Sequence, residues 1–115
     1  MPRVIRPLAL LTVLTALLAI APSASAKSCG IGDERSYGTT YVTKISASGT
    51  SCRSARKVIR AFHGCRPGAK GKCSERVKGY SCSERRFNKG PTSFDSNVTC
   101  RKGDATVKHT YTQFI

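Results

Sequence analysis

The sequence predicts a small α+β domain, in which one amphipathic helix packs on a mostly antiparallel sheet of about four strands. Three observations predict it: residues 41–48 alternate with a period of two, residues 52–63 have helical spacing, and the 115-residue chain holds six cysteines. The expected order is strand-helix-strand-strand-strand. A helix lying on one face of a small antiparallel sheet buries the apolar faces of both.

The first predicted strand is YVTKISAS, residues 41–48. Its β-branched and aromatic residues alternate with polar ones, which is typical of a half-buried strand. The alternation places Tyr41, Thr43, Ile45 and Ala47 on one face. The preceding segment, 27–40, is glycine-rich and polar, so we expect a loop there.

The helix is predicted from about Cys52 to His63. Ser51 is a suitable N-cap, and Gly64 a suitable C′ residue. Helical spacing gathers one apolar stripe, formed by Cys52, Ala55, Val58, Ile59 and Phe62. The opposite side carries four cations, Arg53, Arg56, Lys57 and Arg60.

The remaining strands are predicted over 76–82, from Asn97 onward, and over 105–114. Between the first two, residues 83–96 form a polar stretch broken by Gly90-Pro91, which indicates a long loop. In the third strand Val98 and Cys100 share a face. Residues 101–104, RKGD, indicate a tight turn. In the last strand the residues that share a face are Ala105, Val107, His109 and Tyr111.

The amino-terminal 26 residues are typical of a secretory signal peptide. Arg3 and Arg6 precede an apolar run, and the segment closes on Ala24-Ser25-Ala26. The run is too short for a membrane span, which needs about 20 residues. We therefore expect a signal peptide over 1–26, cleaved after Ala26, an N-terminal loop segment over 27–40 and a disulfide-stabilised domain over 41–115. The protein is expected to be secreted, either extracellular or in the cell wall.

All six cysteines lie after this segment, and an even number in a short exported chain indicates three disulfides. They are Cys29, Cys52, Cys65, Cys73, Cys82 and Cys100. The chain has no C-x-x-C pair, and we expect neither a metal site nor a cofactor. Each bridge would contribute about 2–4 kcal/mol to stability. Because Cys52 also lies on the apolar stripe, it is interpreted as a structural half-cystine rather than a catalytic thiol.

The pairing is open at this level, except that Cys65–Cys73 would close a flexible glycine- and lysine-rich connection. If the helix and the second strand run antiparallel, the start of the helix lies near the end of that strand. This favours Cys52–Cys82 together with Cys29–Cys100. The alternative is Cys82–Cys100 together with Cys29–Cys52.

Three motifs resemble a group of small exported actinobacterial proteins: TSCRSARKV at 50–58, VKGYSC at 77–82 and VTCRKGDATV at 98–107. The shared pattern is T-S-C-x-x-A-[RN]-x-V, then an aromatic-x-Cys strand, then V-x-C and a glycine turn. The resemblance implies an exported helix-plus-strands protein. It carries no activity that could be transferred residue by residue.

Charge is the strongest functional signal. The formal net charge is +14, and removal of Arg3 and Arg6 with the signal peptide leaves +12. Such a surface attracts polyanions, and outside the cell these are anionic wall polymers, anionic membrane surfaces and extracellular nucleic acid. A basic surface that only confers solubility is the competing interpretation. The candidate polyanion-binding residues are Arg53, Arg56, Lys57, Arg60, Arg85 and Arg86.

We therefore expect a monomeric, non-enzymatic domain with no catalytic residues and no small-molecule substrate. One alternative is a secreted nuclease or toxin that uses His63 and His109 for acid–base chemistry. Another is a protease inhibitor that presents loop 83–96, where Arg85 or Arg86 would suit a trypsin-like pocket.

Overall fold

The computed structural model describes residues 25–32, 36–37 and 40–115. The predicted signal peptide lies outside these residues, apart from its last two positions. The described elements are β1 (Lys27–Cys29), β2 (Ser36–Tyr37), β3 (Thr40–Ser48), α1 (Cys52–Cys65), β4 (Ser81–Phe87), β5 (Ser93–Lys102) and β6 (Ala105–Phe114).

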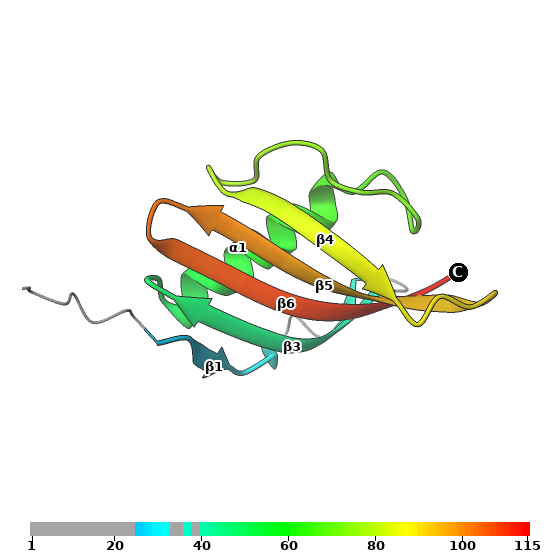
Figure 1. Ribbon diagram of the computed structural model, residues 1–115, viewed down its shortest axis with the longest axis horizontal. Coiled ribbons are helices and arrows are strands. Elements are labelled where there is room, and N and C mark those ends of the chain that lie inside the picture. Colours follow the sequence, from blue (N-terminus) through cyan, green and yellow to red (C-terminus); the bar gives the residue numbers. More distant parts are fainter. Residues whose placement is uncertain (1–24, 33–35, 38–39) are drawn as a thin grey trace, which may run out of the picture.

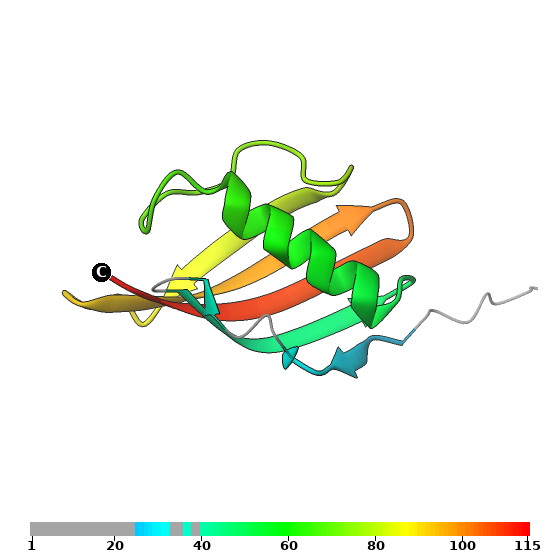
Figure 2. The same ribbon diagram turned by 180° about the vertical axis from the view of Figure 1, so that it is seen from behind.

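The strands form one antiparallel sheet in the order β1-β3-β6-β5-β4, and β2 pairs with β3. Helix α1 crosses one face of this sheet, and no described element covers the other face (Figures 1 and 2). The predicted α+β class and element order are confirmed. The short strands β1 and β2 lie where the sequence predicts a loop.

Helix α1 begins as predicted but ends later. The Ser51 side chain accepts a hydrogen bond from the Ser54 backbone N–H at 3.1 Å, which is the expected N-cap. The helix then continues through Gly64 to Cys65, so the predicted C′ role of Gly64 is wrong. Arg66 precedes Pro67, and a residue before proline is disfavoured in helical conformation, so Arg66 is extended (φ −67°, ψ 126°) and ends the helix.

The buried face of α1 is the predicted apolar stripe, with Ala55, Val58, Ile59 and Phe62 all at most 2% exposed. It packs on the inward face of β3 and β6. There Ile45, Val107 and Tyr111 are fully buried. Burial of each such large side chain contributes about 1.5–3 kcal/mol. This apolar layer holds the helix across the centre of the sheet.

A β-bulge in β3 changes which of its residues face the core. Val42 faces Tyr111 and Lys44 faces Thr110, so Thr43 is an extra residue without a partner on β6. Val42 is consequently buried at 2% exposure, whereas Tyr41 is 39% exposed. The prediction that Tyr41 and Thr43 share a face with Ile45 and Ala47 is therefore wrong. The placement of Ile45 and Ala47, after the bulge, is confirmed.

The prediction for residues 76–96 is also wrong. Val77 and Tyr80 form only an isolated bridge, and β4 runs over Ser81–Phe87. The predicted loop 83–96 is largely the β4–β5 hairpin. It appears polar in the sequence because Glu84, Arg86 and Ser96 point inward and hydrogen-bond one another, so the strands lack apolar alternation.

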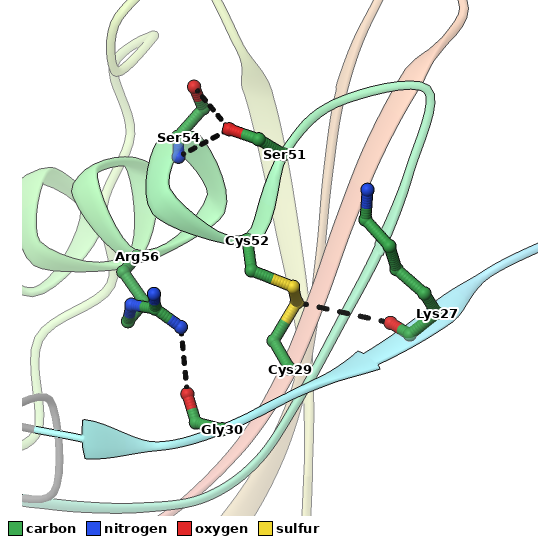
Figure 3. Close-up of a disulfide and its surroundings, with 7 residues drawn as sticks. All are labelled: Lys27, Cys29, Gly30, Ser51, Cys52, Ser54 and Arg56. Carbon is green, nitrogen blue, oxygen red and sulfur yellow. Dashed lines mark hydrogen bonds between the residues drawn. A yellow bond between two sulfur atoms is a disulfide. The ribbon is translucent and has the colours of Figure 1, made fainter.

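The disulfides are Cys29–Cys52, Cys65–Cys73 and Cys82–Cys100. The Cys65–Cys73 prediction is confirmed, while the favoured Cys52–Cys82 and Cys29–Cys100 pairs are wrong and their alternative is correct. Cys82 and Cys100 face each other in register across β4 and β5. Strand β1 places Cys29 beside the start of α1, where Arg56 also donates a hydrogen bond to the Gly30 carbonyl at 3.0 Å (Figure 3).

Candidate functional site

The uncovered face of the sheet presents polar side chains in rungs, which are sets of residues that face one another in register on neighbouring strands. The middle rung runs across five strands and consists of Ser28, Ser46, Lys108, Thr99 and Ser83. The rung on one side of it consists of Ser48, Thr106, Arg101 and Ser81. The rung on the other side consists of Lys44, Thr110, Asn97 and Arg85. We call these three rungs the sheet-face site.

The sheet-face site contains four cations and otherwise only serine, threonine and asparagine. The cations, Lys44, Arg85, Arg101 and Lys108, are all exposed. Three of them follow a diagonal, because Arg101, Lys108 and Lys44 lie on successive rungs and on the neighbouring strands β5, β6 and β3. Successive rungs on one face are about 7 Å apart. The arrangement therefore forms a cationic track rather than an isolated charge.

Two shallow hollows lie along this track. One, of about 290 Å³, contains Lys44, Asn97 and Lys108 among its lining residues. The other, of about 230 Å³, is lined in part by Arg101, Thr106 and Lys108. Lys108 and Ser46 border both hollows, so the track is continuous across the middle rung.

The track ends at a rung of different character. There Asp95 accepts hydrogen bonds from Thr112 at 2.6 Å and Asn88 at 2.9 Å, and these bonds lower the pKa of its carboxyl. Beside it, the exposed rings of Tyr41 and Phe114 pack edge to face with centroids 5.6 Å apart. The track is thus bounded by a hydrogen-bonded carboxylate and an aromatic pair.

The predicted polyanion-binding residues do not form one surface. Arg53, Lys57 and Arg60 are exposed on α1, and α1 lies on the opposite face of the sheet from the sheet-face site (Figure 2). Arg85 belongs to the sheet-face site. Arg86 points the other way, to the helix side of the sheet, where its guanidinium pairs with Glu84 at 2.9 Å and stacks on Phe94 at 4.3 Å.

The helix side of the sheet also holds a buried polar cluster that the sequence did not predict. The Glu84 side chain is 4% exposed. Besides the Arg86 pair, it accepts hydrogen bonds from the hydroxyls of Ser96, at 3.0 Å, and Tyr111. Arg66, another cation of the sequence, is only 8% exposed and lies over the Tyr111 ring at 4.6 Å. The period-two spacing of Cys82, Glu84 and Arg86 was the available signal for these inward positions.

The two histidines meet in this cluster, with their Nε2 atoms 2.9 Å apart. Arg66 Nη1 lies 3.1 Å from His63 Nδ1, and a guanidinium can only donate. His63 Nδ1 must therefore be the acceptor, its proton sits on Nε2, and that N–H donates to His109 Nε2. The proton of neutral His109 is then on Nδ1, which is buried and has no hydrogen-bond partner among the described residues.

The electrostatics keep both imidazoles neutral. Burial, reinforced by the charge of Arg66, lowers the pKa of His63 to about 3. Burial lowers the pKa of His109 well below 6.5 as well, with smaller contributions from His63 and Arg66. Acid–base catalysis needs substrate access and a pKa near the working pH. His109 is 2% exposed, so this geometry disfavours the nuclease hypothesis and indicates a structural pair.

The described part of the chain offers no cluster of three or more His, Cys, Asp or Glu side chains arranged to hold a metal ion. None of its helices combines the length and apolar composition needed to cross a bilayer. No protein-family model, no curated protein and no solved structure matches the chain. The function is therefore inferred from the residues themselves.

Proposed function

We propose that the chain is a secreted, basic, non-enzymatic domain that binds anionic polymers of the cell envelope through the sheet-face site. The observation that carries the proposal is the composition of three neighbouring rungs, which hold four exposed cations and no carboxylate. Cations placed among neutral hydroxyls remain available to an external anion, because no acidic neighbour in these rungs pairs with them.

The expected binding is polyvalent. A single exposed ion pair contributes at most about 1 kcal/mol. A polymer that crosses several rungs engages several cations at once and releases its condensed counterions, so its affinity falls steeply with salt. The surrounding serine, threonine and asparagine side chains can add hydrogen bonds to phosphate or sugar oxygens. The aromatic pair at the end of the track offers an apolar surface for a sugar ring.

The protease-inhibitor alternative has less support, because Arg85 and Arg86 and most of the other residues assigned to its loop lie on β4 and β5. Arg86 in particular is engaged by Glu84, Phe94 and the carbonyls of Lys70 and Gly71. A protease would need an extended and exposed segment at this position. The polyanion proposal needs only the side chains that are already exposed.

The test compares two double variants that lose the same charge from opposite sides of the molecule. Arg101→Ser with Lys108→Ser alters the sheet-face site, and Arg53→Ser with Lys57→Ser alters the outer side of α1. Retention of the oxidised protein on heparin and on isolated cell wall is measured across a salt gradient.

The sheet-face variant is expected to elute at clearly lower salt, and its slope of log K against log salt should fall by about 1 for each lost contact. The helix variant should remain close to the parent protein. Equal shifts for the two variants would mean that net charge alone governs retention, and the proposal would then fail.

A further inference from the structure

A cleft of about 550 Å³ lies at the β4 edge of the sheet, between the connection that follows α1 and the β4–β5 turn. It shares no lining residue with the two hollows of the sheet-face site, although Arg85 of that site also lines it. We call it the edge cleft. Its lining residues are Lys70, Lys72, Glu84, Arg85, Arg86, Lys89, Gly90, Phe94 and Ile115.

One wall of the edge cleft is the short loop closed by the Cys65–Cys73 disulfide. Arg86 fixes this loop to β4 by donating to the carbonyls of Lys70, at 2.7 Å, and Gly71, at 2.9 Å. Arg66 donates to the Gly71 carbonyl from the core side, at 3.0 Å. The backbone that carries Lys70 and Lys72 is therefore held in place by a covalent bond and by two buried or half-buried guanidinium groups.

The opposite wall is the turn that carries Lys89. The Gly90 backbone N–H donates to the Ser93 carbonyl at 2.9 Å, which closes the turn. The Ile115 backbone N–H donates to the Thr92 carbonyl, also at 2.9 Å, which fixes the apolar side of the cleft. Both walls are thus positioned before any ligand arrives, and this reduces the entropy lost on binding.

The charges that line the edge cleft are unbalanced. Glu84 is its one acidic side chain, and both carboxylate oxygens are occupied, one by Arg86 and the other by Ser96 and Tyr111. Arg86 is occupied in turn by Glu84, Phe94 and the two loop carbonyls. Four cations remain: Arg85, which belongs to the sheet-face site as well, and the lysines Lys70, Lys72 and Lys89. Within the described residues no carboxylate forms an ion pair with them.

We propose that the edge cleft binds a phosphate group, either as a monoester or as a diester. Its three lysines come from two separate walls, and a tetrahedral phosphate has oxygens that can face both walls at once. A planar carboxylate is better matched by a guanidinium fork; the fork of Arg86 is already used, and Arg85 extends from the opposite face of the sheet, as part of the sheet-face site. Phe94 and Ile115 provide a small apolar surface for the carbon skeleton to which the phosphate is esterified. The site does not require the sheet-face site to bind anything.

The ester has two possible sources, a soluble phosphate compound or a lipid headgroup, and the experiment distinguishes them. Backbone amide shifts of the oxidised protein are followed by NMR with inorganic phosphate, glycerol 3-phosphate, and vesicles of phosphatidylglycerol or phosphatidylcholine. Sodium acetate at matched ionic strength is the control for general anion effects.

Phosphate and glycerol 3-phosphate are expected to shift the amides of Gly71 and Gly90, saturating at millimolar concentration, and acetate is not. Preferential binding of the soluble ester assigns a soluble source, and preferential binding of phosphatidylglycerol vesicles assigns a lipid. Lys70→Ala with Lys72→Ala should weaken binding by about fivefold or more. The matched control, Arg53→Ala with Lys57→Ala, should leave it unchanged.

The lysines of the edge cleft are exposed, so these variants are expected to fold, and their amide spectra report this directly. The absence of shifts at the cleft up to about 10 mM phosphate would overturn the proposal, because the dissociation constant would then lie above the concentrations at which a phosphate ligand could occupy the site. Equal weakening by the helix variant would overturn it too. Retention that does not depend on the sheet-face site, together with phosphate shifts at the cleft, would refute only the proposed function.

Discussion

Acidification from pH 7.5 to pH 5 is expected to destabilise the protein through its buried imidazole pair. Both histidines have folded-state pKa values below the ordinary 6.5, about 3 for His63 and well below 6.5 for His109. Below pH 6.5 the two imidazoles therefore bind protons in the unfolded chain but not in the folded chain. The contribution of the two histidines to the unfolding free energy is fully present above pH 6.5 and declines as the pH falls toward their folded-state pKa values.

The magnitude follows from the width of that interval. One pH unit costs about 1.4 kcal/mol for each group that is protonated only in the unfolded state. At pH 5, the proton taken up by unfolded His63 accordingly costs about 2 kcal/mol, and His109, whose pKa burial also lowers, adds a loss in the same direction. Together these losses are a sizeable part of the about 5–15 kcal/mol by which small domains are stable. The groups that face the pair are Arg66, which opposes its protonation, and Tyr111, whose own pKa is raised to about 12 by burial and the Glu84 hydrogen bond.

The assay is urea unfolding of the oxidised protein at pH 7.5 and pH 5, with the imidazole signals titrated by NMR in the folded state. At pH 5 ordinary carboxyl groups, with pKa values of about 4, remain mostly ionised, so the histidines dominate the change. His63→Gln should reduce the loss by about 2 kcal/mol, and the loss that remains then comes from His109. Folded-state titration near pH 6.5, or an unfolding free energy that is equal at the two pH values, would refute the reasoning.

Two further predictions concern single side chains. Glu84→Gln is expected to lower the unfolding free energy by about 3 kcal/mol, because it leaves the buried guanidinium of its partner without a counter-charge, whereas exposed Glu75→Gln should change it by less than about 0.5 kcal/mol. Equal effects in urea unfolding would contradict this. Gly49 has φ +69°, and an added Cβ would lie 2.5 Å from the Asp104 carbonyl oxygen, while Gly103 has φ +54° with open space around it. Gly49→Ala should therefore cost about 3 kcal/mol and Gly103→Ala about 1 kcal/mol in the same assay.

The parts of the fold that the sequence predicts are those in which periodicity follows burial. The stripe of α1 is apolar at helical spacing, and the inward residues of β6 alternate with outward ones at a period of two; the sequence predicts both. β3 was only half predicted, because the extra residue at its bulge reverses the alternation. No local propensity marks that position, since it is fixed by the pairing of β3 with β6.

The sequence does not predict the β4–β5 hairpin, for a different reason. Its inward positions include Glu84, Arg86 and Ser96, whose burial is tolerable only because they satisfy one another's hydrogen bonds. A single sequence does not show that partnership. The wrong strand bounds also led to the wrong disulfide pairing. The strand predicted over 76–82 ends at Cys82, whereas β4 begins at Ser81, directly before Cys82. The direct Cys82–Cys100 pairing across two strands was thereby obscured.

The same burial changes what the net charge means. In the sequence, Arg66 and Arg86 count as surface cations. In the structure they donate hydrogen bonds to backbone carbonyls and lie over aromatic rings, and Arg86 pairs with Glu84. They hold the disulfide-closed loop against β4 and so position the lysines of the edge cleft. These two buried cations cannot bind an external polyanion, but they determine the geometry of the edge cleft. A variant series should therefore separate two effects that composition combines: substitution of exposed cations is expected to change salt-dependent retention, and substitution of the buried ones to change the shape of the cleft.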